Sequence, residues 1–261
     1  MSGRWRRALA ALALAAMAGG AVALAQRGGV GGGFRGLRGG IPVAPNIPYD
    51  GRFTFVRLRY GPPTDFVSQR LMWSHDYPIG EQHFMKILNE LSYLNPHTAE
   101  TNILGIGDPE LFKYPVAYLC EPGRAFDMTD EEAANLRDYL HKGGFLIVDD
   151  FRYEDWGYFE AQMRRVLPSA QFQDIDQTHP IFNSFFAIKQ LEVPQMYDQG
   201  PPIFRAIFED NDPRKRIMVM INYNTDISEY WEFSDTGFLP IDESNEAYKI
   251  GVNYVIYGMT H

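Results

Sequence analysis

The chain has 261 residues, 45% of them hydrophobic, which is enough to build the core of one large domain or two small ones. Its net charge of −9 argues against nucleic acids and anionic membrane surfaces as partners. Its one cysteine, Cys120, excludes an intramolecular disulfide and a cysteine-based zinc site.

The first 25 residues have the parts of a secretory signal peptide. Three arginines precede a segment rich in alanine and leucine, and Ala23-Leu24-Ala25 matches a cleavage site. We therefore predict that residues 1–25 are removed, leaving no transmembrane span and an exported protein that is periplasmic or extracellular. The alternative is an uncleaved helix that tethers the N-terminus to the membrane. Residues 26–50, rich in glycine, arginine and proline, predict a flexible linker.

Residues 51–261 are predicted to form a single domain in which strands and helices alternate. The capping box Thr129-Asp130-Glu131-Glu132 begins one helix, and Gly143 or Gly144 ends it. The other elements expected in this part are strands at 53–60, 101–104, 115–120 and 145–150, helices at 81–94 and 154–166, and a helical turn at 108–113.

The last third of the chain has a looser pattern. Residues 203–208 and 216–223 are typical of strands, and the turn at 209–213 between them predicts a hairpin. A closing helix is expected at 244–257. Repeated strand–helix–strand units predict an α/β three-layer sandwich on a mostly parallel sheet, with the hairpin or extra strands at the C-terminal side.

The most informative stretch is the apolar run 145–148, which is followed directly by Asp149 and Asp150. An unbroken apolar run predicts a strand buried on both faces, and ligands of such sheets lie beyond the carboxyl ends of the strands. Either carboxylate could be a general base, a metal ligand or an acceptor for sugar hydroxyls. The alternative is structural: one caps a helix and the other pairs with Arg152.

Other polar residues also follow strands. His179, before Pro180, could act as an acid or base, or be a loop histidine bonded to the backbone. Cys120 is more typical of a buried small residue than of a reactive thiol. The remaining ligand-binding candidates are His75 and Asp76 in the first loop, Arg152, and the group Asn224, Asp226, Tyr230, Trp231 and Glu232, where aromatic rings beside carboxylates are typical of sugar binding.

Several motifs resemble the bacterial family catalogued as domain of unknown function 4159, from about Phe53 to the C-terminus. They are Asp-Pro-Glu-Leu-Phe followed by Tyr-Pro, Gly-Gly-Phe-Leu-Ile-Val-Asp-Asp, His-Pro-Ile-Phe, and Asn-Tyr-Asn-x-Asp with Trp-Glu. That family looks like a branch of the class I glutamine amidotransferase-like superfamily and is similar to its trehalose-utilisation proteins. The resemblance implies a flavodoxin-like fold. However, Asp149-Asp150 stands where the nucleophilic cysteine would be expected, and no His-x-Glu pair follows.

Two functions follow from these observations. The first is an exported domain that binds a carbohydrate, another small molecule or an envelope protein without amidotransferase chemistry. The second is a hydrolase or isomerase of a sugar-like or amide substrate, with Asp149, Asp150 and His179 as acid and base. No cofactor is expected, although a divalent metal would suit the carboxylates.

Overall fold

A seven-stranded sheet forms the centre of the computed structural model, which describes residues 40–68, 70–191 and 200–261. Its first five strands in spatial order are parallel, and each of the last two pairs antiparallel with the strand before it. Across the sheet the order is β4 (Asn102–Gly105), β2 (Val56–Arg59), β5 (Val116–Cys120), β6 (Phe145–Phe151), β9 (Ile217–Tyr223), β8 (Ile203–Phe208) and β7 (Gln173–Asp174).

The order of the parallel strands sets where a site can form. The chain goes from β2 to β4 on one side and then to β5 on the other, so the connections diverge between β2 and β5. Loops that leave the carboxyl ends of these two strands turn away from each other, and this is where open α/β sheets bind ligands.

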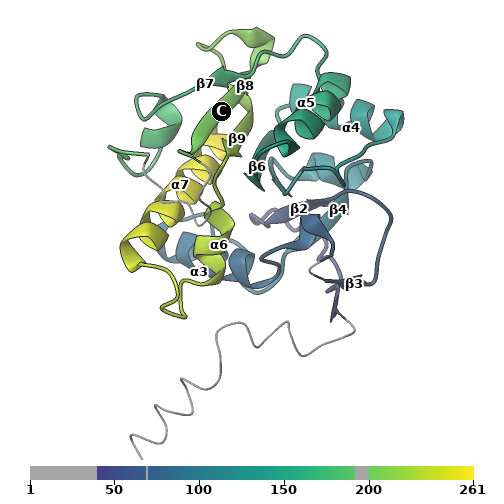
Figure 1. Ribbon diagram of the computed structural model, residues 1–261. Coiled ribbons are helices and arrows are strands. Elements are labelled where there is room, and N and C mark those ends of the chain that lie inside the picture. The colour runs from purple at the N-terminus through teal and green to yellow at the C-terminus, as the bar shows by residue number, and fades with distance from the viewer. Residues whose placement is uncertain (1–39, 69, 192–199) are drawn as a thin grey trace, which may run out of the picture. The chain divides into compact units, whose positions relative to one another are not determined.

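Helices cover both faces of the sheet (Figure 1). On one side α3 (Ile79–Leu91), α6 (Ile227–Glu232) and α7 (Ile241–Thr260) pack against one another. On the other side α4 (Asp130–His141) packs against α5 (Asp155–Val166). These contacts confirm the predicted α/β fold with a mostly parallel sheet and antiparallel C-terminal strands.

Side chains of β5 and β6 point alternately to the two faces of the sheet. Tyr118 and Ile147 belong to the core that includes Phe84 of α3, Trp231 of α6 and Tyr254 of α7. All five residues of β5 and all seven of β6 are buried, as the unbroken apolar runs predicted. The two central strands therefore have no solvent-exposed face, and only their ends are open to chemistry.

The local signals of the sequence lie where they were expected. The Thr129 side chain accepts from the Glu132 amide and the Glu132 side chain accepts from the Thr129 amide, so the capping box is present. Gly143 follows the C-cap with a φ of 108°, a conformation that favours glycine. The turn at 209–213 joins β8 to β9 as an antiparallel hairpin.

Short elements complete the unit. Residues 46 and 47 are hydrogen-bonded to β4: Ile47 N donates to Asn102 Oδ1 at 2.9 Å, and Asn46 Nδ2 donates to the Ile103 carbonyl at 2.8 Å. Contacts with the domain therefore begin before residue 51, the boundary that composition suggested. The short elements are strands β1 (Ile41–Pro42) and β3 (Phe66–Val67), which pair, and 3₁₀ turns η1 (Met72–Ser74), η2 (Pro109–Lys113), η3 (Pro180–Asn183) and η4 (Glu209–Asn211).

The predicted signal peptide, residues 1–25, lies outside the described residues, as does the linker up to residue 39. Among the helices that the structure does describe, none is both long and apolar enough to span a bilayer. Cleavage and export remain predictions from the sequence.

Candidate functional site

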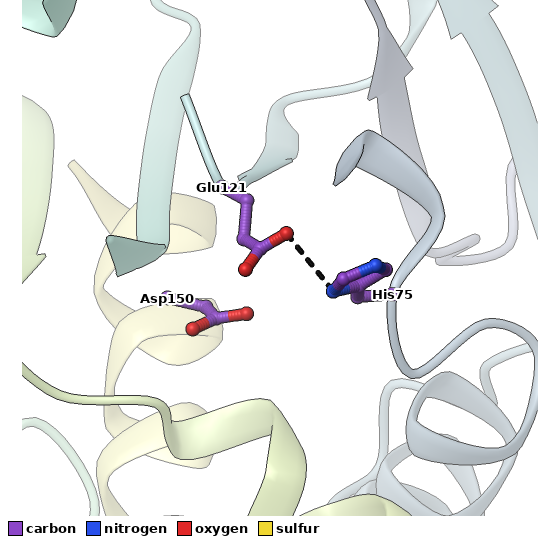
Figure 2. Close-up of side chains that lie close together, drawn as sticks. All are labelled: His75, Glu121 and Asp150. Carbon is purple, nitrogen blue, oxygen red and sulfur yellow. Dashed lines mark ion pairs between the residues drawn. The ribbon is translucent and has the colours of Figure 1, made fainter. Parts of the chain in front are cut away.

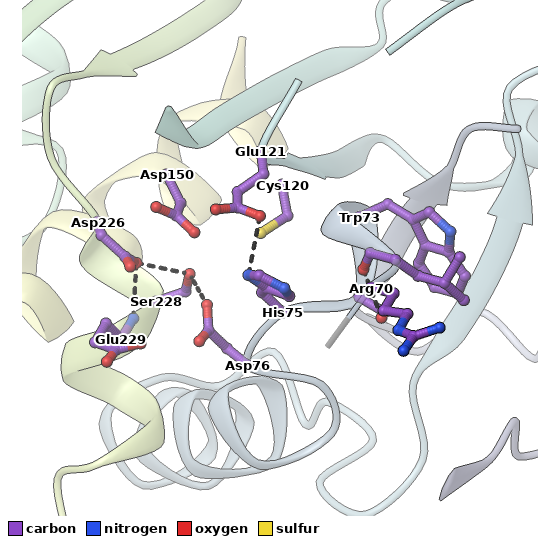
Figure 3. Close-up of polar contacts among 12 residues, drawn as sticks. Arg70, Trp73, His75, Asp76, Cys120, Glu121, Asp150, Asp226, Ser228 and Glu229 are labelled. Carbon is purple, nitrogen blue, oxygen red and sulfur yellow. Dashed lines mark hydrogen bonds and ion pairs between the residues drawn. The ribbon is translucent and has the colours of Figure 1, made fainter. Parts of the chain in front are cut away.

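Acidic side chains from four segments meet at the carboxyl edge of the sheet (Figure 3). They come from the loop before α3, the ends of β5 and β6, and the short helix α6 with its N-cap. Because parallel strands all end at the same edge, residues far apart in the chain are brought together. The group consists of His75, Asp76, Cys120, Glu121, Asp150, Asp226, Ser228, Glu229 and Glu232.

Glu121 follows β5 directly and faces His75. Its backbone has a φ of 43°, and the Tyr60 hydroxyl donates to its carbonyl oxygen at 2.6 Å, which fixes this turn. Glu121 Oε2 lies 2.9 Å from His75 Nδ1, within ion-pair distance (Figure 2). The angles at this contact are not those of a hydrogen bond, so among the described residues Oε2 is buried without one.

Asp150 lies one residue before the end of β6 with a φ of 57°, where the pairing with β9 is irregular. Its side chain is 5% exposed, and its nearest cationic group is Arg152 Nη1, 3.6 Å from Oδ1. No described residue donates a hydrogen bond to this carboxylate. Burial, and then the charges of Asp226 and Glu121, raise the pKa of Asp150 well above its ordinary value.

A second acidic group surrounds Ser228 at the start of α6. The Ser228 hydroxyl lies 2.5 Å from Asp76 Oδ2 and 3.2 Å from Asp226 Oδ1. Asp226 also caps α6 by accepting from the Glu229 amide at 2.9 Å. Burial, followed by the charge of Asp76, raises the pKa of Glu229 and of Glu232 to about 8. The charge of Asp76 therefore makes Glu229 and Glu232 harder to ionise.

A buried ion pair holds the loop that carries His75. Arg57 of β2 and Glu81 of α3 are each 1% exposed, with Arg57 Nε 2.6 Å from Glu81 Oε1. Arg57 Nη1 also donates to the Trp73 carbonyl at 2.9 Å. One guanidinium thus ties together a strand, a helix and the η1 turn that ends at His75.

Asp149 has a structural role in this arrangement. Its carboxylate is fully buried and accepts from Asn222 Nδ2 at 3.0 Å, from the Ile227 amide at 3.1 Å and from the Ser228 amide at 3.2 Å. Burial raises its pKa to about 6, although these hydrogen bonds favour the ionised form. Asp149 therefore anchors the start of α6 to the central strand, facing away from Asp150.

Cys120 lies beside the cluster, but its thiol is buried. Its residue has no exposed surface, and burial raises the pKa of the thiol well above the ordinary value. A protonated thiol is a poor nucleophile. This agrees with the interpretation of Cys120 as a small buried residue.

His179 lies at the other end of the sheet. Its ring packs near Phe208 and Tyr257, with centroids 5.6 and 6.4 Å away, beside the start of β9, where the Ile217 amide donates to the Tyr257 hydroxyl. His179 Nδ1 accepts from the Ile181 amide at 3.2 Å, as a loop histidine bonded to the backbone would. The structure therefore does not bring His179 to Asp149 and Asp150 as the acid–base hypothesis required.

The aromatic residues of the predicted sugar-binding group lie in the core. Trp231 is 1% exposed, and its ring stacks on Phe84 at 4.3 Å between centroids, so its face is covered. Tyr230 is also buried. Asn224 donates from Nδ2 to the Pro201 carbonyl, outside the acidic cluster. Of this group only Asp226 and Glu232 join the cluster.

Two of the cluster's central residues were not predicted. Glu121 was assigned to the turn that ends a strand, although it follows β5 just as Asp149 and Asp150 follow the apolar run of β6. The strand-end rule applied equally to every strand would have found it. Glu229 stands in a helix start that the sequence did not reveal.

Three groups among the described residues could hold a metal ion, each with ligand atoms within 4.8 Å of one another. They share Asp76 or Asp150, so they belong to one continuous acidic region. The groups are His75, Glu121 and Asp150; Asp76, Cys120 and Asp150; and Asp76, Glu229 and Glu232.

The raised pKa values of Glu229 and Glu232 predict a pH-dependent stability. These carboxyls stay protonated in the folded protein up to about pH 8, whereas unfolded glutamates ionise near 4.5. Between these values the folded state binds more protons, so the free energy of unfolding falls as the pH rises. We expect the unfolding temperature of the chelator-treated protein to fall between about pH 5 and pH 8.

The double variant Glu229→Gln/Glu232→Gln should show a flatter profile over the same range. Glu90→Gln, which changes an exposed glutamate of α3, is the matched control and should keep the wild-type slope. Thermal unfolding at several pH values measures this, and equal slopes in the wild type and the double variant would contradict the prediction.

These features define an open α/β domain with an acidic site at the carboxyl edge of its parallel strands. The family model described as "Domain of unknown function (DUF4159)" matches residues 54–259, and the chain belongs to this family. The match confirms the resemblance seen in the sequence motifs. No curated protein matches the chain.

Proposed function

We propose that this domain binds a positively charged ligand at the carboxyl edge of its sheet, within a flavodoxin-like fold of the class I amidotransferase type. The order of the parallel strands, 2-1-3-4-5 by position in the chain, supports the fold because it is the flavodoxin-like order. The buried, protonated Cys120 supports a domain without the Cys-His-Glu chemistry of true amidotransferases.

The observation that carries the proposal is Asp150. A carboxylate that is 5% exposed and receives no hydrogen bond from any described residue is costly to bury. Its neighbour Asp149 shows how the fold satisfies a structural carboxylate, with four donors: Asn222 Nδ2, the Tyr118 hydroxyl and the Ile227 and Ser228 amides. Asp150 lacks such donors and faces His75 and Glu121 instead (Figure 2). A bound cation would supply the missing interaction.

The charge around Asp150 supports a cation rather than a neutral or anionic ligand. Within the described ranges, no lysine or arginine lies at ion-pair distance from Asp76, Asp226, Glu229 or Glu232, and only Arg152 approaches Asp150. Carboxyl groups brought together in a buried place favour a positively charged ligand, because a bound cation stabilises the ionised form of all of them at once.

A ligand screen by thermal unfolding of the full chain tests the proposal. The panel contains polyamines, basic amino acids, short basic peptides, divalent metals and neutral sugars. A ligand at 100 times its dissociation constant stabilises by about 2.7 kcal/mol, which is a readily measured shift. We expect at least one cationic ligand to stabilise the wild type and to lose this effect in Asp150→Asn.

Asp235→Asn is the matched control, because Asp235 is exposed beyond α6 and should leave the shift unchanged. Stabilisation by neutral sugars alone would favour the carbohydrate hypothesis over a cationic ligand. If no ligand gives a shift that depends on Asp150, the proposal is wrong.

Export and an envelope partner belong to the same proposal. The sequence of residues 1–25 supports secretion, and a flexible segment before the domain would allow a bound ligand or protein to be presented at the cell envelope.

A second candidate function is hydrolysis or isomerisation of a sugar-like or amide substrate. The specific observation in its favour is that Glu121 Oε2 lies 2.9 Å from His75 Nδ1, which places a carboxylate beside an imidazole, two of the groups that acid–base catalysis uses. The raised pKa of Asp150 would let that carboxyl act as an acid. In this version His75 takes the role that the sequence gave to His179, Asp150 keeps its predicted acid–base role, and Asp149 has none. Turnover that disappears in both His75→Ala and Asp150→Asn would support it.

A further inference from the structure

One group within the acidic region differs from the rest because it contains an imidazole. His75, Glu121 and Asp150 come from three separate segments: the loop before α3, the end of β5 and the end of β6. Their ligand atoms all lie within 4.8 Å of one another, and the three side chains converge on one point (Figure 2).

We propose that His75, Glu121 and Asp150 bind a divalent transition-metal ion of the Zn²⁺ type. This inference rests on the proposed function, and it names the ligand class of the same site. Three protein ligands of the types His, Glu and Asp, with a fourth position left for water or substrate, form the donor set of an open zinc site.

Two observations beyond acidity point to a bound ion. Asp150 is more than nine-tenths buried, aims at the group and has no hydrogen bond from a described residue. Independently, Glu121 Oε2 is a buried oxygen without a hydrogen bond, although it lies 2.9 Å from His75 Nδ1. Carboxylate oxygens at two strand ends therefore lie together beside His75 without a hydrogen bond from a described residue, and the ion-pair partner of Asp150 in the described part of the chain is Arg152 Nη1 at 3.6 Å.

The spacing suits an ion of this size. Ligand atoms about 2.1 Å from a tetrahedral zinc ion are about 3.4 Å from each other. The 2.9 Å between His75 and Glu121 would need to open slightly, which removes a contact with poor hydrogen-bond angles. His75 is the most accessible of the three side chains, at 29% exposed, and so provides the open side of the site.

The imidazole nitrogen of His75 favours some metal ions over others. Ca²⁺ and Mg²⁺ prefer sites made of oxygen atoms alone, whereas an imidazole nitrogen suits Zn²⁺ and its transition-metal neighbours. The alternative group of Asp76, Glu229 and Glu232 offers only carboxylates. Metal binding that depends on His75 would therefore indicate a transition-metal ion, and would place it at His75, Glu121 and Asp150 rather than at Asp76, Glu229 and Glu232.

The experiment is a Zn²⁺ titration of the full chain, made without a polyhistidine tag and freed of metal with a chelator, against a chromophoric zinc competitor. We expect one ion per chain and a loss of affinity of about tenfold or more in His75→Ala, Glu121→Gln and Asp150→Asn. Ca²⁺ and Mg²⁺ should bind more weakly than Zn²⁺. Co²⁺ in place of Zn²⁺ should give the visible absorption of a four-coordinate ion, and His75→Ala should lose it.

His97→Ala is the matched control. His97 also lies beside a carboxylate, with Nε2 3.1 Å from Asp50 Oδ2, but its amide donates to the Phe53 carbonyl, ahead of the amino end of β2, so its loss should leave the affinity unchanged. His75→Ala removes a partly exposed side chain, so its far-ultraviolet circular dichroism should match that of the wild type.

Absence of Zn²⁺ binding, or an affinity that His75→Ala leaves unchanged, would overturn the inference. So would binding that is lost only in Glu229→Gln and Glu232→Gln. If an organic cation still stabilises the wild type through Asp150 while Zn²⁺ does not bind, the metal site is wrong but the proposed function stands. If nothing binds through Asp150, both fail.

Discussion

Replacing Asp149 with alanine is expected to lower the free energy of unfolding by about 3–5 kcal/mol. The change leaves the Asn222 side-chain amide and the Ile227 and Ser228 backbone amides buried without their acceptor. Each unsatisfied buried donor costs about 1–3 kcal/mol. Because domains of this kind are stable by only about 5–15 kcal/mol, the loss should be evident as a large shift of the urea midpoint.

The adjacent carboxylate provides the control. Asp150→Asn removes a carboxyl whose ionisation is opposed by burial and then by the charges of Asp226 and Glu121, and it breaks no hydrogen bond with a described residue. It should leave stability unchanged or raise it. Opposite outcomes for two neighbouring aspartates would separate the residue that the fold needs from the one that a ligand needs. If Asp149→Ala costs no more than Asp150→Asn, this division of roles is wrong.

The carboxyl edge could be predicted from the sequence because topology alone assembles it. Once alternating strands and helices indicate parallel strands, their ends must meet at one edge, so His75, Cys120, Asp149 and Asp226 were expected to line one crevice. The structure brings His75, Cys120 and Asp226 to this edge, but it is Asp150 that joins them, because Asp149 is bonded to Asn222 and to the start of α6. The argument needs only the direction of each strand and no knowledge of side-chain contacts.

The predictions that placed His179 and Trp231 at the site were wrong for one physical reason. Each residue lies in or near a short element that leaves no periodic pattern in the sequence. The two-residue strand β7 and the turn after it lead the chain to the end of α7, so His179 lies away from the site. Trp231 follows a strand end, but a six-residue helix turns its ring into the core against Phe84. Such short elements give too little sequence to show which way a side chain faces.

The roles of the two adjacent aspartates could be predicted only in part. Strand alternation places Asp149 and Asp150 on different sides, which is what the structure shows. Which of them would be satisfied depended on donors far away in the chain: Tyr118, and Asn222, Ile227 and Ser228 more than 70 residues further along. A single sequence does not reveal such distant partners.

Arg57 is the remaining residue whose loss should have a large effect. Arg57→Met leaves Glu81 buried without its cation and removes the donor to the Trp73 carbonyl, so we expect a loss of about 3–5 kcal/mol in the free energy of unfolding. Chemical denaturation of the purified variant measures this loss. A cost below about 1 kcal/mol, the range of an exposed pair, would contradict it.

The double variant Arg57→Met/Glu81→Leu tests the reason for that cost. Removing both charges takes away the uncompensated carboxylate, so the double variant should be clearly more stable than Arg57→Met alone. Stability should recover in the double variant, but the position of His75 should not. The Trp73 carbonyl would still lack the donor that fixes the turn before His75. A double variant with restored stability and weakened ligand or metal binding would therefore show that this buried pair also positions the site. Restored binding together with restored stability would show that Arg57 serves the fold alone.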